Sequence, residues 1–174
     1  MGHWARLFKN EWGKQVKYRI ISVGKIREPF YNNGIQEYLK RLKSYTNIEL
    51  IDGLEEKISP KAGAGEIDKC IQKEGAKIID LVSDDEIVIA FDIKGELLSS
   101  EEWAQYIEGL NVRSSGRVNM IVGGSFGLDE KVKQRAERLI SFSRMTFPHQ
   151  MAVLMLTEQI YRGFKINKRE PYHK

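Results

Sequence analysis

The sequence predicts an α/β domain in which a mostly parallel sheet carries helices on both faces. The first observation is the alternation of short apolar runs with longer segments whose apolar residues recur at helical spacing. The second is that two apolar runs, EIVIAFDI (86–93) and RVNMIVGG (117–124), are nearly continuous. Strands of this kind are buried on both faces, which is typical of a parallel sheet covered by helices.

The individual elements follow from the same patterns. The predicted strands are 17–24, 47–52, 86–93, 117–124 and 138–143, and the predicted helices are 29–43, 66–82, 100–110, 128–138 and 148–167. Pro29 suits the first turn of a helix, and Ser99 or Ser100 caps the third helix. Lys94 and Gly95 are predicted to turn the chain after the third strand. A loop is predicted at 53–65, which is rich in Gly, Pro, Lys and Glu.

Composition limits the class of protein. The chain has 174 residues, 41% of them hydrophobic, which is enough for one domain with its own core. The net charge of +4 permits an anionic partner without requiring one. Cys70 is the only cysteine, so an intrachain disulfide is excluded and a reducing, cytoplasmic environment is expected. Cys70 and the three scattered histidines do not show the spacing of metal ligands, so no metal site is predicted.

No membrane partner is predicted either. No apolar run approaches the roughly 20 residues that span a bilayer, and the N-terminus lacks the apolar centre of a signal peptide. Residues 1–16, MGHWARLFKNEWGKQV, are interpreted as an N-terminal extension, with a single domain over 17–174. The alternative is that the Trp, Leu and Phe side chains of this extension line a short membrane-surface or partner helix.

In open α/β sheets ligands bind beyond the carboxyl ends of the strands, so the residues that follow each strand are candidates for a site. Gly123 and Gly124 end the fourth strand and Gly127 precedes a helix, a GGxxG turn that lets a ligand approach the backbone. The same turn also fits a tight connection without a ligand. Asp92 follows the third strand, where it can accept a hydrogen bond from a ligand hydroxyl or cap a turn.

The segment SFSRMTFPHQ (141–150) is an unusual entry into a helix, because it has three hydroxyls, two Phe and a Met but no Gly, Asn or Asp. Pro148 suits the first helical turn, whereas Phe147 cannot cap the helix and Thr146 sits early. Backbone N–H groups are then left to donate to a ligand, beside apolar side chains that can hold an aromatic ring. The segment predicts a purine site; the alternative is a loop that its two Phe pack into the core.

The last helix carries a second candidate surface. Arg162, Lys165 and Arg169 recur at i, i+3 and i+7. With Lys168 they form a predicted basic ridge suited to phosphates, although a solvated helix face is the alternative. The chain then ends in REPYHK (169–174), where an aromatic ring and an imidazole can stack on a base or fray.

Several of these segments closely resemble one family. IVGG at the glycine turn, LISFSRMTFPHQMAVLMLTEQIYRGFKI and the terminal PYHK are similar to the RlmH family, as are KYRIISVGK and FDIKGELLSSEEWA, so the resemblance covers about residues 17–174. It implies a SPOUT-class, S-adenosylmethionine-dependent methyltransferase. The implied substrate is N3 of a pseudouridine in large-subunit (23S) ribosomal RNA of assembled ribosomes. A homodimer and a C-terminal trefoil knot are implied as well.

The resemblance also assigns roles to individual residues. The implied S-adenosylmethionine site consists of Phe91, Gly123, Phe142, Ser143, Arg144, Met145, Thr146 and Phe147. The implied contacts to the RNA are Arg162, Lys165, Arg169, Tyr172, His173 and Lys174. The implied catalytic residues are Arg144, Tyr172 and His173. The target nitrogen must lose a proton, and His173 is a better candidate for its base than His149, which lies just inside a helix.

Two other classes of function are weighed against this reading. A nucleotide-binding oxidoreductase would use the glycine turn, but GGxxG departs from the usual GxGxxG and the acid expected after it is missing. A non-enzymatic RNA- or ribosome-binding module would use the basic ridge and would not need the 141–150 segment. That segment is expected to take its shape from threading and from its ligand rather than from local turn chemistry.

Overall fold

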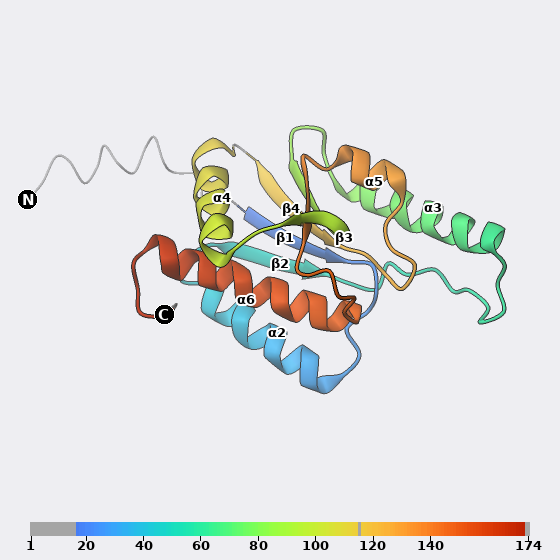
Figure 1. Cartoon of the computed structure of the whole chain (residues 1–174), viewed down its shortest axis with the longest axis horizontal. Coiled ribbons are helices and arrows are strands. Elements are labelled where there is room, and N and C mark those ends of the chain that lie inside the picture. Colours follow the sequence, from blue (N-terminus) through green and yellow to red (C-terminus); the bar gives the residue numbers. More distant parts are fainter. Residues whose placement is uncertain (1–16, 115, 173–174) are drawn as a thin grey trace, which may run out of the picture.

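The computed structural model describes residues 17–114 and 116–172, which form a five-stranded sheet with helices on both faces (Figure 1). Every strand pair is parallel, in the order β2-β1-β4-β3-β5. The strands are β1 (Lys17–Ser22), β2 (Asn47–Ile51), β3 (Ile87–Leu97), β4 (Arg117–Val122) and β5 (Arg138–Ser141). The helices are α2 (Pro29–Leu42), α3 (Ala64–Leu81), α4 (Ser100–Arg113), α5 (Glu130–Arg135) and α6 (His149–Asn167). The predicted α/β class is confirmed; the extension 1–16 lies outside the described residues.

Successive side chains of each strand point to opposite faces of the sheet, which gives the domain two apolar cores. On one face, Ile20 of β1 and Met120 of β4 are fully buried in the core that α2, α4 and α6 cover. On the other face, Ile21 and Ile121 are buried in a smaller core that α3 and α5 complete. None of the described helices combines the length and apolar character needed to cross a membrane.

The helix starts follow the predicted capping chemistry. Pro29 occupies the first turn of α2. Ser99 caps α4 in a reciprocal arrangement: its Oγ accepts from Glu102 N at 3.1 Å, and Glu102 Oε2 accepts from Ser99 N at 2.7 Å. The two alternatives left open at Ser99 and Ser100 are thereby decided in favour of Ser99.

β3 is longer than predicted, and the turn predicted at Lys94 and Gly95 is wrong. The strand continues to Leu97 and keeps pairing with β5, with a register shift between Phe91 and Glu96. A Cβ on Gly95 would stand 2.5 Å from the carbonyl carbon of Ile140. The glycine therefore permits a close approach of two strands at an irregularity, and it does not reverse the chain.

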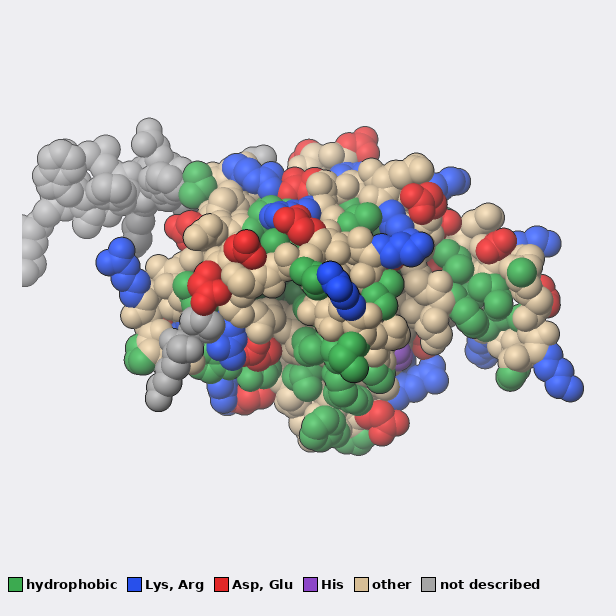
Figure 2. All heavy atoms as spheres, viewed as in Figure 1, with side chains coloured by type: hydrophobic (Ala, Val, Ile, Leu, Met, Phe, Trp, Pro, Cys, Tyr) green, Lys and Arg blue, Asp and Glu red, His purple; other side chains and the backbone are tan. Residues whose placement is uncertain are grey.

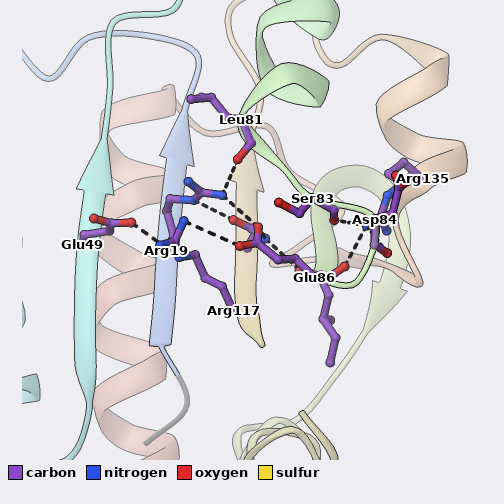
Figure 3. Close-up of polar contacts among 10 residues, drawn as sticks. Arg19, Glu49, Leu81, Ser83, Asp84, Glu86, Arg117 and Arg135 are labelled. Atoms are coloured by element: carbon purple, nitrogen blue, oxygen red, sulfur yellow. Dashed lines mark hydrogen bonds and ion pairs between the residues drawn. The ribbon is translucent and has the colours of Figure 1, made fainter. Parts of the chain in front are cut away.

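A buried polar cluster lies toward the amino ends of the strands (Figure 3). The Arg19 guanidinium donates to Asn119 Oδ1 at 2.7 Å and to Glu86 Oε2 at 3.0 Å. It also donates to the carbonyl of Leu81 at 2.6 Å. Asn119 Nδ2 donates to the same Glu86 oxygen at 3.0 Å. We call Arg19, Glu86 and Asn119 the amino-end cluster; it ties β1 and β4 to the connection between α3 and β3.

A second arginine closes that connection from outside. Arg135, the last residue of α5, donates through Nη2 to the carbonyls of Ser83, Asp84 and Glu86 at 2.9, 3.2 and 2.8 Å (Figure 3). The carbonyls of this turn cannot pair within a strand or a helix, so the guanidinium supplies the donors that they need. The amino ends of the strands are thus closed by contacts within the chain.

Candidate functional site

The carboxyl ends of β3, β4 and β5 surround a cavity of about 460 Å³. Its walls come from residues 91–93 of β3, where the pairing with β4 stops, from the turn after β4, and from the segment that connects β5 to α6. The lining residues are 91–93, 122–125, 127–128, 140–143, 145–149 and 152. Of the residues implied to bind S-adenosylmethionine, Phe91, Gly123, Phe142, Ser143, Met145, Thr146 and Phe147 line this cavity. Arg144 is exposed and does not line it.

The glycine turn forms one wall and folds back on itself. Gly127 N donates to the Gly124 carbonyl at 3.1 Å, and the two glycines form an isolated antiparallel bridge. Gly127 has a φ of +86°, a conformation that glycine adopts without strain. A Cβ on Gly123 would stand 3.1 Å from the Gly127 carbonyl carbon. The glycines are therefore required by the turn itself, and they also leave backbone exposed to the cavity.

The segment 141–148 forms the opposite wall, and serine side chains shape it. Ser141 Oγ donates to the Ser143 carbonyl at 2.7 Å, and Ser143 Oγ accepts from Met145 N at 3.0 Å. These are local side-chain to backbone bonds of the kind that replace Asn, Asp or Gly in turns. The expectation that local turn chemistry plays no part in this segment is wrong, because two of its three hydroxyls supply that chemistry.

The apolar side chains of the segment divide between core and cavity. The Phe142 ring stacks on Phe91, with ring centroids 4.8 Å apart and planes 14° apart. Phe142 thereby packs against the large core, as the structural alternative for this segment expected. Met145 is 72% exposed and Phe147 is half-buried, and both line the cavity. The core reading is thus confirmed for Phe142, while the purine site beside Met145 and Phe147 stays a prediction.

The first turn of α6 opens toward the cavity. Pro148 occupies the capping position, and no side chain caps the helix. Thr146 therefore does not cap it. A helix start without a side-chain cap leaves backbone N–H groups that can donate to a ligand. These donors lie beside Met145 and Phe147, so the wall combines polar backbone with apolar side chains, as small-molecule sites commonly do.

His149 has a structural role at this helix start. Its Nε2 lies 3.1 Å from the Lys25 carbonyl, to which it donates. A Cβ on Gly24 would stand 2.4 Å from the same nitrogen, so the ring packs directly on that glycine. The next residue, Gln150, accepts from Arg27 N and Glu28 N at 2.8 and 2.9 Å. Together they attach the start of α6 to the connection between β1 and α2.

Asp92 lines the cavity and caps the irregular part of β3, so its predicted capping role is confirmed, and acceptance of a ligand hydroxyl stays a prediction. Its Oδ1 accepts from Lys94 N at 2.9 Å, and its Oδ2 lies 3.1 Å from Lys133 Nζ of α5. Burial alone would raise the pKa of this carboxyl, but the Lys94 N–H and the Lys133 ammonium outweigh it and lower the pKa. Asp92 is thus a fixed carboxylate at neutral pH.

A second cavity of about 570 Å³ lies between α2, α4 and α6 and was not predicted. Its walls include Tyr38, Trp103 and Leu154, and it shares Phe91 and Phe142 with the first cavity. Its apolar helix residues read in the sequence as ordinary core positions, and the polar residues beside them form no motif, so no signal marks this cavity in the sequence.

Two of the four cations of the predicted basic ridge are paired with the chain's own acids. Arg162 Nη2 lies 2.6 Å from Glu158 Oε1, and Lys165 Nζ lies 2.6 Å from Glu170 Oε2. Arg169 lies beyond the end of α6, with a φ of 54°, so it does not continue the helical spacing. Lys168 and Arg169 are exposed, so the ridge is neutralised in part, and RNA contacts by these residues stay a prediction.

The described part of the tail is packed, not frayed. Tyr172 OH donates to Glu158 Oε1 at 3.0 Å and lies 3.2 Å from Tyr38 OH. The Arg162 guanidinium lies 4.8 Å from the centre of the Tyr172 ring. Burial, followed by the contacts with Tyr38 and Glu158, raises the pKa of Tyr172 above its usual range, so it is a hydrogen-bond donor rather than a base. His173 and Lys174 lie outside the described residues.

Within residues 17–114 and 116–172 there is no group of three or more His, Cys, Asp or Glu side chains placed to hold a metal ion.

The chain is similar to known proteins over nearly its whole length. The sequence model of a family described as "Predicted SPOUT methyltransferase" matches residues 16–173. A protein from Syntrophomonas wolfei named "Ribosomal RNA large subunit methyltransferase H" is 57% identical over 159 residues, which cover 91% of this chain and all of that protein. A protein of the same name from Enterococcus faecalis is 44% identical over the same extent of both chains. A third from Clostridium acetobutylicum is 41% identical over 155 residues, or 89% of this chain and 98% of that protein. This chain therefore belongs to the SPOUT methyltransferase family.

Proposed function

We propose that this chain transfers a methyl group from S-adenosylmethionine to N3 of a pseudouridine in large-subunit (23S) ribosomal RNA. The observation that carries the proposal is the cavity at the carboxyl ends of β3, β4 and β5, lined by residues that the family resemblance assigns to the methyl donor. Family membership supports the reaction class, and the names of the relatives support ribosomal RNA as the substrate.

The cavity fits the methyl donor in size and in chemistry. Its volume of about 460 Å³ is within the range of roughly 300–1,000 Å³ typical of small-molecule sites. Met145 and Phe147 offer apolar surface for the adenine, and the first turn of α6 offers N–H donors for its edge. The exposed backbone of Gly123 leaves room for the ribose and the methionine part.

S-adenosylmethionine itself supplies the electrophilic methyl group, so no metal is required for the transfer. The protein contributes alignment of the two reactants and exclusion of water. His149 and Gln150 hold the start of α6 against the connection after β1, which fixes one wall of the cavity. The Phe91–Phe142 stack fixes the floor.

The target nitrogen must lose its proton during the transfer, and we assign this role to His173. A histidine side chain is the usual proton acceptor near neutral pH, whereas His149 is engaged with the Lys25 carbonyl and Tyr172 donates to Glu158. Tyr172 and Arg144 are assigned to placing the nucleotide, Tyr172 by holding the tail on α6 and Arg144 as an exposed cation beside the cavity segment.

A second copy of the chain is the proposed partner on the face of α2 and α6. The cavity between α2, α4 and α6 opens on this face, and Phe30 of α2 is 75% exposed. Figure 2 shows hydrophobic side chains gathered over this side of the molecule. In such a homodimer the tail of one copy can serve the site of the other.

The substrate is proposed to be the assembled ribosome in the cytoplasm. With Arg162 and Lys165 paired to the chain's own acids, little free charge on α6 is left for a naked RNA backbone. Recognition of a preformed ribosomal surface, where shape contributes, requires less of that charge. The family also supports the C-terminal trefoil knot, in which the segment 141–148 would be part of the threaded chain.

Mass spectrometry of ribosomal RNA from cells with and without this protein tests the function. We expect one methylated pseudouridine in the large-subunit RNA to disappear in the deletion strain and to return with the wild-type gene. Complementation with His173→Ala should restore little methylation although the variant binds S-adenosylhomocysteine normally. An unchanged RNA in the deletion strain would contradict the function, and full restoration by His173→Ala would contradict only the role of the base.

A further inference from the structure

Asp92 is the only acidic side chain among the residues that line the methyl-donor cavity in the described part of the chain. It directly follows Phe91, which pairs with Val122 of β4 and Ile140 of β5. The carboxylate therefore stands at the central carboxyl edge of the sheet, with the glycine turn on one side and the segment 141–148 on the other. A ligand in the cavity lies against this position.

The carboxylate is fixed and its charge is balanced. Lys94 N and Lys133 Nζ each contact one of its oxygens, at 2.9 and 3.1 Å, and its side chain is only 12% exposed. A carboxylate has about four acceptor positions, so each oxygen keeps capacity for one further donor. Held at two points, the side chain can accept these donors without losing further freedom on binding.

The balanced charge indicates what kind of donor it accepts. An unpaired carboxylate would favour a cation, such as the ammonium group of a bound amino acid. The Asp92–Lys133 pair carries no net charge, so neutral hydroxyl donors match it better than a second ammonium beside Lys133. A pair of adjacent hydroxyls suits a carboxylate geometrically, and acids at strand ends bind ribose hydroxyls in other α/β sheets.

We propose that Asp92 binds the two ribose hydroxyls of the methyl donor, and that Lys133 keeps its carboxylate ionised and in place. This inference rests on the proposed function, because it presupposes an adenosine-containing ligand in the cavity. It gives a role to the β3 irregularity, since the register shift after Phe91 is what allows Lys94 N to turn toward Asp92.

Calorimetric titration with S-adenosylhomocysteine and its 2′-deoxy and 3′-deoxy forms tests the inference. A hydrogen bond to a charged group is worth enough that losing one hydroxyl should weaken binding to the wild-type protein roughly 10- to 100-fold. Asp92→Ala should bind all three ligands with similar, weakened affinity, because the hydroxyls have lost their acceptor. Asp92→Asn, which keeps the shape and one acceptor oxygen, should show an intermediate dependence.

Glu96→Ala is the matched control. It removes another carboxylate of β3 that pairs with an arginine, Arg138, at 2.8 Å, and it lies outside the cavity lining. Its titrations should repeat those of the wild-type protein. Equal affinity of the wild-type protein for S-adenosylhomocysteine and both deoxy forms would overturn the inference, even if Asp92→Ala did not fold. Absence of any binding of S-adenosylhomocysteine would overturn the proposed function together with it.

Discussion

The two ends of the parallel sheet satisfy their polar groups in opposite ways. At the amino ends, Arg19, Glu86 and Asn119 bond to one another, and Arg135 covers the adjoining turn (Figure 3). At the carboxyl ends, the Asp92 carboxylate and the first turn of α6 face a cavity. Polar groups removed from water must have partners. The amino end finds them within the chain, whereas the first turn of α6 at the carboxyl end has no side-chain cap and can offer its N–H groups to a ligand.

The amino end of the sheet should therefore determine the stability of the fold, and the carboxyl end should determine the binding of a ligand. A substitution in the amino-end cluster leaves a buried polar group without a partner. This lowers the free energy of unfolding. A change in the cavity wall removes contacts that form only with a ligand, so its cost appears in affinity. Variants at the two ends should therefore move different measurements, and each prediction below tests this separation.

The largest effect is expected for Arg19→Met. Methionine removes the charge and the donors and leaves the Glu86 carboxylate, 13% exposed, with only Asn119 and the more distant Arg117 as partners. Breaking a buried ion pair from one side costs about 3–5 kcal/mol. Urea denaturation followed by circular dichroism should show that loss in unfolding free energy, while the affinity for S-adenosylhomocysteine in the absence of urea stays unchanged. A loss of unfolding free energy below about 1 kcal/mol would contradict the view that the amino-end cluster is a buried, stabilising network.

A smaller effect, on affinity alone, is expected for Phe147→Ala. Its ring lines the cavity, and stacking of a base on an aromatic side chain contributes roughly 1–3 kcal/mol, or about tenfold or more in affinity. Calorimetric titration with S-adenosylhomocysteine measures the change. Phe126→Ala is the control, because Phe126 is a partly exposed aromatic residue of the neighbouring glycine turn that does not line the cavity. Equal affinities of the two variants would contradict a purine site beside Phe147.

The smallest effect is expected for Glu137→Gln, at an exposed ion pair near the amino end of β5. Glu137 bonds Arg113 and Tyr106, and the Arg113 contact is the main reason that its pKa is lowered. Because exposed pairs are screened, the loss should be below about 1 kcal/mol. A lowered folded-state pKa means that the contribution is complete above the unfolded pKa of about 4.3 and disappears as the pH falls through the folded-state value.

Urea denaturation at neutral pH and at acidic pH checks both parts of this prediction. The wild-type protein and Glu137→Gln should differ slightly at neutral pH and become equally stable in acid. A larger loss than that of Arg19→Met would reverse the ranking of buried and exposed pairs on which the comparison depends.

Much of the fold and of the cavity wall could be predicted from the sequence. Nearly continuous apolar strands indicate a covered parallel sheet, and ligands bind beyond the carboxyl ends of such strands. These two rules place Phe91, Gly123 and the segment 141–148 at one edge, where the structure has them. Membership of a methyltransferase family then sets aside the oxidoreductase that the glycine turn alone left open.

What could not be predicted depends on contacts between distant residues. The extension of β3 past Gly95 depends on the approach of the β5 backbone, which no local pattern encodes. The pairing of Lys165 with Glu170 forms across the end of α6 and has no helical spacing. The pairing of Glu158 with Arg162, by contrast, has the i, i+4 spacing of a helix pair and could have been expected from the sequence.

The Phe91–Phe142 stack has a consequence for regulation. The same two rings form a wall of the methyl-donor cavity and a wall of the cavity between α2, α4 and α6. Ile140 and Ser141 also line both cavities, so these four residues together separate the two spaces. A shift of the Phe142 ring on one side would reshape the other. If the proposed second copy docks over the cavity between α2, α4 and α6, we expect its binding and that of the methyl donor to alter each other by the same factor.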